Sequence, residues 1–184
     1  NESLNTLYQI ISMETFWYGV TIGFFAQIID GALGMAYGIS ATTFLLSLGT
    51  SPAVASASVH IAAVFTTGLS GIAHVKFGNV SKSLFMRLLL PGIIGAFFGV
   101  LFVTKLDGEL IKPLVSFYLL VMGALIIKKS LFKKQQAKIK GSKISKLALA
   151  GGFMDSAGGG GWGPIVTSTL VGAGQDPRST IGSV

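Results

Sequence analysis

Charged residues are nearly absent from the first long segment of this chain. Between Thr15 and Val75, the only Asp, Glu, Lys or Arg is Asp30. A soluble stretch of this length could not be covered by one charge, because about 25% of the residues in soluble domains are charged. The segment therefore predicts helices that cross a lipid bilayer, each of which needs about 20 mainly apolar residues.

The whole chain has the same character. Of its 184 residues, 51% are hydrophobic and 11% are charged. Apolar stretches that could hold a spanning helix lie at residues 16–36, 53–75, 84–104, 111–127 and 147–171. We therefore predict an all-α fold, that of a polytopic integral membrane protein whose helices have the bilayer as a partner.

The basic residues are concentrated in one short segment. Eight of the fourteen lie between Lys128 and Lys146, with no acidic residue among them. Basic loops between membrane helices stay in the cytoplasm, so this distribution predicts a cytoplasmic loop and argues against a nucleic-acid partner. By the same rule the loop near residue 80 is inside and the mixed-charge turn at 105–112 is outside. We expect residues 1–15 to be extracytoplasmic.

Two parts of the chain resemble each other at an offset of 125 residues. Asp30 to Val59 align with Asp155 to Val184 without a gap, and ten of thirty positions are identical, where chance gives about two or three. The identical positions of the first copy are Asp30, Ala32, Gly34, Gly38, Thr42, Leu45, Gly49, Pro52, Ser58 and Val59. We interpret this as a duplicated repeat.

The repeat divides the chain into four segments. Residues 1–15 precede a first transmembrane repeat at 16–128, a basic cytoplasmic linker follows at 129–146, and a second repeat starts at 147–184. The first repeat is expected to begin outside the cell and the second inside. The two copies are therefore expected to be inverted, as in many transporters.

Each copy contains an Asp followed by a glycine-rich stretch. The second has four consecutive glycines, Gly158 to Gly161, and then Pro164. Each glycine costs a helix about 1 kcal/mol relative to alanine, and proline removes a backbone donor, so we predict broken helices. Broken backbone at membrane depth occurs where it is buried in protein or lines a cavity, and helix N-termini there suit anions. The alternative is that small residues only allow close helix packing.

The two repeated aspartates have three interpretations. Asp30 and Asp155 could bind and release protons, cap the helix that follows the break, or lie near lipid headgroups. His60 could belong to the site or be a satisfied core imidazole. The candidate substrate-binding residues are Asp30, Gly31, Gly34, Tyr37, Gly38, Thr42, His60, Asp155, Gly158, Gly159, Gly160, Gly161, Trp162, Gly163 and Thr167.

Enzyme and metal chemistry have little support in the sequence. There is no cysteine, and His60 and His74 would be about 21 Å apart along one helix. Gly158, Gly160 and Gly163 fit a dinucleotide-binding pattern, but no βαβ unit surrounds them, and there is no Walker A motif. We therefore expect no catalytic site, no metal and no cofactor.

These motifs resemble the sulfite exporter TauE/SafE family of membrane transporters. The similarity rests on Gly158 to Pro164, on Gly174, Pro177 and the run from Ser179 to Val184, and on the basic linker. It implies movement of a small anion, such as sulfite or sulfoacetate, across a bacterial or archaeal cytoplasmic membrane without ATP. An anion channel and a non-transport membrane assembly protein remain alternatives, and a homo-oligomer remains open.

Overall fold

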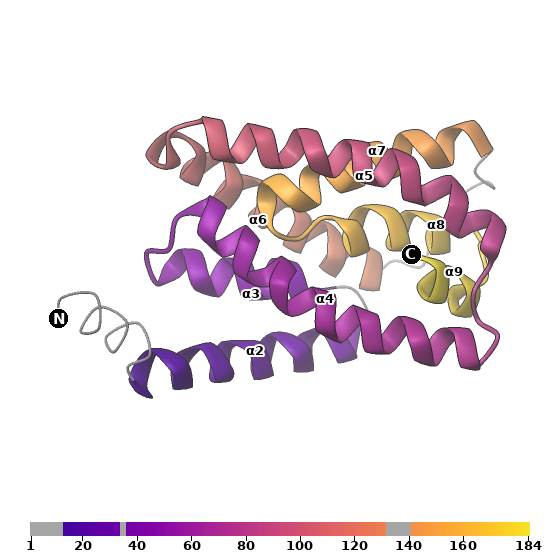
Figure 1. Ribbon diagram of the computed structural model, residues 1–184, viewed down its shortest axis with the longest axis horizontal. Helices are drawn as coiled ribbons and strands as arrows, with labels where there is room; N and C mark the ends of the chain where they lie inside the picture. Colours follow the sequence, from indigo (N-terminus) through magenta and orange to yellow (C-terminus); the bar gives the residue numbers. More distant parts are fainter. Residues whose placement is uncertain (1–12, 34–35, 132–140) are drawn as a thin grey trace, which may run out of the picture.

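The fold is all-α, as predicted. The computed structural model describes residues 13–33, 36–131 and 141–184, and within these ranges it contains helices and short turns but no strand (Figure 1). In chain order the elements are α2 (Met13–Leu33), α3 (Tyr37–Ser47), α4 (Pro52–Lys76), α5 (Lys82–Lys105), α6 (Gly108–Leu131), α7 (Gly141–Gly158), the π-helix η1 (Trp162–Thr167), α8 (Ser168–Gly172) and α9 (Pro177–Ser183).

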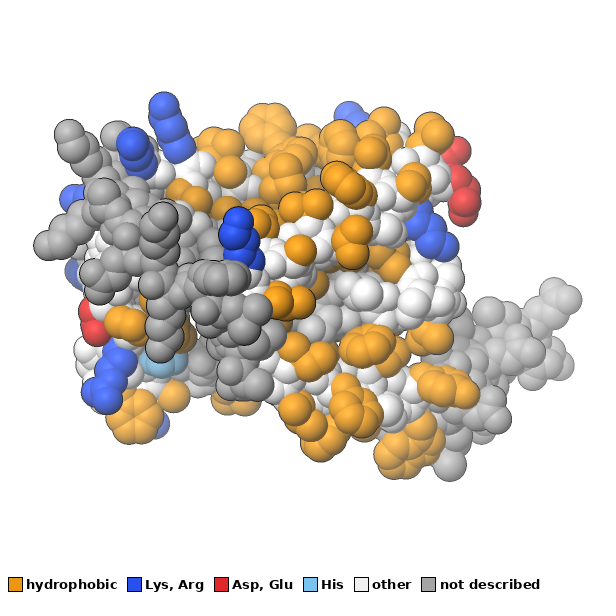
Figure 2. Space-filling view, turned by 180° about the vertical axis from the view of Figure 1, so that it is seen from behind, with side chains coloured by type: hydrophobic (Ala, Val, Ile, Leu, Met, Phe, Trp, Pro, Cys, Tyr) orange, Lys and Arg blue, Asp and Glu red, His pale blue; other side chains and the backbone are white. Residues whose placement is uncertain are grey.

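Within the described residues, three helices are long and apolar enough to cross a membrane. They are α4, α5 and the part of α6 from Gly108 to Lys128, which confirms the spans predicted at 53–75, 84–104 and 111–127. Their outer surfaces are apolar: Phe65 and Leu69, for example, are 70% and 72% exposed. Hydrophobic side chains cover the middle of the face in Figure 2, and most charged ones lie toward its two ends. The protein is a multi-pass membrane protein.

Four of the described elements, α3, η1, α8 and α9, are too short to cross the hydrocarbon core alone. α3 has 11 residues, and at 1.5 Å per residue it is about 16 Å long, half the thickness of that core. The predicted stretch at 147–171 is not one helix either, because α7 ends at Gly158 and η1 begins at Trp162. Helical structure also enters the segment assigned to the linker, since α6 continues to Leu131 and α7 begins at Gly141.

The most extensive helix contact joins α5 and α7, and it depends on glycine. Gly95 and Gly99 of α5 are buried against the backbone of α7, and the carbonyl oxygen of the buried Gly92 lies against Gly152 of α7. A Cβ added to Gly95 would overlap the carbonyl oxygen of Leu149, and one added to Gly152 would overlap that of Gly92. In lipid, small residues let two helices approach until their backbones touch, and dispersion then holds them together.

The cytoplasmic position of the basic loop can be tested with single cysteines, because the chain has none of its own. We expect Ser142→Cys to be protected from an impermeant maleimide added to intact cells and to react after permeabilisation. Asp107→Cys, in the mixed-charge turn between α5 and α6, is the matched control and should react without permeabilisation. Labelling of Ser142→Cys from outside would reverse the topology.

Candidate functional site

Asp155 connects the end of α7 to the start of η1. Its Oδ1 accepts hydrogen bonds from the backbone N–H groups of Gly161 at 2.7 Å and Trp162 at 3.0 Å. The first N–H groups of a helix have no acceptor within it, and its N-terminus favours negative charge. The Asp155 carboxylate therefore stabilises the start of η1 across the three residues that follow α7.

Asp30 makes the same contacts in the first part of the chain. Its Oδ1 accepts hydrogen bonds from the backbone N–H groups of Ala36 at 2.7 Å and Tyr37 at 2.9 Å. The acceptor precedes its two donors by six and seven residues, as it does at Asp155. These hydrogen bonds are the ones expected if each aspartate caps the helix that follows it.

The segments after the two aspartates lie directly against each other. The Thr42 hydroxyl in α3 donates to the carbonyl oxygen of Gly159 at 2.8 Å. A Cβ added to Gly38 would lie 2.7 Å from the same oxygen and 2.8 Å from the Gly160 Cα. Gly159 itself has a φ of 73°, a conformation that favours glycine. Glycine is therefore required on both sides of this contact.

A third polar contact joins α4 to α7. His60 Nε2 lies 3.0 Å from Asp155 Oδ2, the carboxylate oxygen that the backbone of η1 does not use. One turn earlier on α4, the Ser56 hydroxyl donates to the carbonyl oxygen of Ser156 at 2.7 Å. Asp155 is thus in contact with α4 and η1 as well as being part of α7.

A cavity of about 690 Å³ lies beside these contacts. The candidate residues that line it are Asp30, Tyr37, Gly38, His60, Asp155, Gly159, Gly160, Gly161, Trp162, Gly163 and Thr167. Thr42 and Gly158 do not line it: Thr42 is fully buried, and a Cβ at Gly158 would meet the Tyr118 ring. Gly31 belongs to α2, and Gly34 is outside the described residues.

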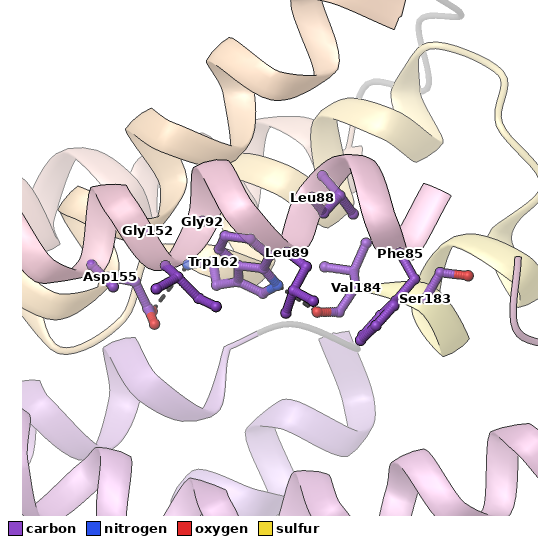
Figure 3. A pocket seen from close by; sticks show the side chains of 11 residues that line it. Phe85, Leu88, Leu89, Gly92, Gly152, Asp155, Trp162, Ser183 and Val184 are labelled. Atoms are coloured by element: carbon purple, nitrogen blue, oxygen red, sulfur yellow. Dashed lines mark hydrogen bonds between the residues drawn. The ribbon is translucent and has the colours of Figure 1, made fainter. Parts of the chain in front are cut away.

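Trp162 lines both this cavity and a smaller apolar one of about 230 Å³, which is shown in Figure 3. The indole lies near Gly92 of α5, where an added Cβ would meet the ring. Its Nε1 donates to the carbonyl oxygen of Val184 at 2.5 Å. The side chain is therefore held between α5, α7 and the end of α9, while its backbone N–H binds Asp155.

Comparison with known proteins identifies the family of the chain. A family profile described as "Sulfite exporter TauE/SafE" matches residues 19–184. The chain belongs to the TauE/SafE family. It is also 45% identical over 170 residues to a protein named "Probable membrane transporter protein YtnM" from Bacillus subtilis (strain 168). That match covers 89% of this chain and 57% of the relative. No solved structure has detectable similarity.

Two polar residues of this TauE/SafE chain were missed by sequence reasoning. Ser56 contacts both His60 and the α7 backbone, and its position four residues before His60 on one helix face was a usable signal. Tyr118 of α6 donates from its hydroxyl to the Gly160 carbonyl oxygen at 3.2 Å. Nothing in the local sequence pointed to Tyr118, because its contact is with a segment 42 residues away.

The Thr42 hydrogen bond predicts a measurable stability difference. Thr42→Val keeps the shape of the side chain but leaves the buried Gly159 carbonyl without this donor, which we expect to cost about 1–3 kcal/mol. Thr43→Val is the matched control, because the Thr43 hydroxyl bonds only the Ile39 carbonyl of its own helix, and we expect it to change stability by less than about 0.5 kcal/mol. Thermal unfolding in detergent measures both; equal midpoints would contradict the assigned role.

Proposed function

We propose that this protein is a transporter that moves a small anion across the cytoplasmic membrane without hydrolysing ATP. Its substrate class is organosulfur compounds and sulfur oxyanions, such as sulfite or sulfoacetate. The printed description of the family and the name of the Bacillus relative support the general activity. The observation that carries the proposal is the meeting of two aspartate-capped helix starts at one cavity.

The proposed architecture is a pair of inverted repeats whose membrane helices are broken at these aspartates. The matched Asp30 and Asp155 bonds support it, since all donors and acceptors correspond at the offset of 125 residues. The turns that follow correspond as well: Gly49 has a φ of 90° and Gly174 one of 80°. In Figure 1, α2 and α7 run in opposite directions along the long axis, as inverted copies would.

The proposed anion site combines backbone dipoles with few side-chain charges. The starts of α3 and η1 both border the cavity. Two N–H groups at each start already donate to Asp30 or Asp155, so the partial positive charge for an anion comes from the other first-turn N–H groups. Thr167 adds a hydroxyl, whereas no Lys or Arg is among the described residues lining the cavity. Arg178, the cation nearest in sequence to η1, is exposed on α9. Weak to moderate affinity is the expected consequence, which suits a carrier that must release its solute.

Proteoliposomes containing the full-length protein test the proposal. We expect saturable uptake of radiolabelled sulfite or sulfoacetate that other sulfonates inhibit and that needs no nucleotide. Thr167→Val should raise KM, whereas Thr169→Val, which does not line the cavity, should not. Flux that rises linearly with concentration would indicate a channel instead. Absence of any anion flux or binding would favour a membrane assembly role and reject the transporter.

A further inference from the structure

The two nitrogens of the His60 imidazole have different hydrogen-bonding partners. Nδ1 lies 2.7 Å from the Ser56 carbonyl oxygen, which can only accept a hydrogen bond. It also lies 3.3 Å from the Ser56 hydroxyl, whose own hydrogen is donated to Ser156. Both neighbours are therefore acceptors, so Nδ1 must carry a hydrogen.

This assignment leaves Nε2 without a proton in the neutral imidazole. Nε2 is nevertheless 3.0 Å from Asp155 Oδ2, an oxygen that can only accept when the carboxyl group is ionised. A second proton must lie between the two atoms, either on the imidazole or on the carboxyl group. The pair is electrically neutral with this proton and carries one negative charge without it.

No other charged side chain of the surrounding helices compensates for that charge. Within the described residues, α5 and η1 contribute only uncharged side chains to the two cavities, and so does α9. Tyr118 of α6 lines neither cavity and donates from its hydroxyl to the Gly160 carbonyl oxygen, whereas Tyr37 of α3 and Asp30 of α2 line the larger cavity. His74, on the same helix as His60, lines that cavity fourteen residues further along α4. Loss of the shared proton therefore places an uncompensated negative charge at the cavity wall.

We infer that His60 and Asp155 form a proton-binding site and that the protein carries one proton together with each anion. This rests on the proposed anion transport and names its coupling ion. Asp30 lines the same cavity, so an anion there meets less negative charge when the pair is protonated than when it is deprotonated, and binding of each ligand therefore favours the other. His60 is on α4 and Asp155 is on α7, so the same proton also forms a hydrogen bond between these two helices.

The test uses a sulfonate such as sulfoacetate, whose sulfonate group stays ionised and prevents passage through lipid as a neutral acid. Proteoliposomes of the full-length protein are held at zero membrane potential with potassium and an ionophore. When the outside is one pH unit more acidic than the inside, we expect the internal sulfonate concentration to rise about tenfold above the external one. A pH dye inside should report acidification that depends on sulfonate. In Asp155→Asn, whose amide can donate to Nε2 without an added proton, this coupled proton movement should disappear.

A binding measurement keeps the assignment testable if a variant does not transport. This sequence has two tryptophans, so replacing Trp17 and every tryptophan outside these 184 residues with phenylalanine leaves the emission of Trp162, whose N–H binds Asp155. This emission should change with pH in the otherwise unaltered protein and after His74→Gln, but not after His60→Gln or Asp155→Asn.

The outcomes separate the two proposals. Saturable sulfonate transport that does not depend on the pH gradient and moves no proton would overturn the coupling inference and leave the proposed function intact. A pH response of Trp162 that survives both His60→Gln and Asp155→Asn assigns the proton elsewhere and overturns the site. Absence of all anion transport overturns the proposed function and the inference with it.

Discussion

Replacement of Asp155 by alanine is expected to abolish transport and to cause a large loss of stability. The backbone N–H groups of Gly161 and Trp162 would lose their acceptor, and His60 would lose its partner. Each buried donor left without a partner costs about 1–3 kcal/mol, so the two N–H groups together cost about 2–6 kcal/mol. Thermal unfolding in detergent and anion uptake in proteoliposomes are the measurements.

Two further variants separate the possible causes of this loss. Asp155→Asn keeps an oxygen that can accept both N–H bonds, so it should recover most of the stability. Asp176→Ala removes an aspartate that caps an exposed helix start, where Oδ2 accepts from the Ser179 N–H at 2.8 Å. That change should cost about 1 kcal/mol. If Asp155→Ala is no more destabilising than Asp176→Ala, Asp155 does not organise the start of η1.

Gly152→Leu is expected to prevent the close contact between α5 and α7. Even the Cβ of alanine at this position would overlap the Gly92 carbonyl oxygen and lie 3.1 Å from the Ala96 nitrogen. The atoms it meets belong to the backbone, so the helices must separate. Gly152→Ala should therefore cost about 1–3 kcal/mol and leucine more, with a lower unfolding temperature and less folded protein in the membrane.

Gly123→Ala is the matched control for this effect. Gly123 also lies within a long apolar helix, α6, but an added Cβ there meets nothing within 4 Å. Alanine is favoured over glycine inside a helix by about 0.5–1 kcal/mol, so this variant should be as stable as the native protein or more stable. Equal destabilisation by Gly152→Ala and Gly123→Ala would show that the contact between α5 and α7 does not depend on glycine.

Much of the fold could be predicted because bilayer thickness imposes a simple length on apolar helices. The spans near 53–75, 84–104 and 111–127 follow from hydropathy alone and coincide with α4, α5 and α6. The small residues of α5 were harder to interpret. Their contacts are with α7, more than 50 residues away, and a glycine pattern does not identify the helix that approaches it.

In the candidate site, too, some residues could be identified from the sequence, whereas the surroundings of others could not. Asp30 and Asp155 were noticed because a lone acid in an apolar segment is costly and because the offset of 125 residues pairs them. Thr42 is paired with Thr167 by the same offset, yet Thr42 is fully buried against Gly159 while Thr167 lines the cavity. The alignment treats the two threonines as equal, but their surroundings come from different helices.

Local chemistry in the sequence was sufficient to establish the helical class, the membrane environment and the two acidic positions that precede glycine-rich stretches. Each of these depends on the solvation of nearby residues, and hydrocarbon penalises exposed backbone and charge wherever they occur. The contact of His60 with Asp155 was decided only by tertiary structure, since the two are 95 residues apart. Packing of α4 against α7 brings them together. The shared proton is a property of that packing, because neither side chain requires it alone.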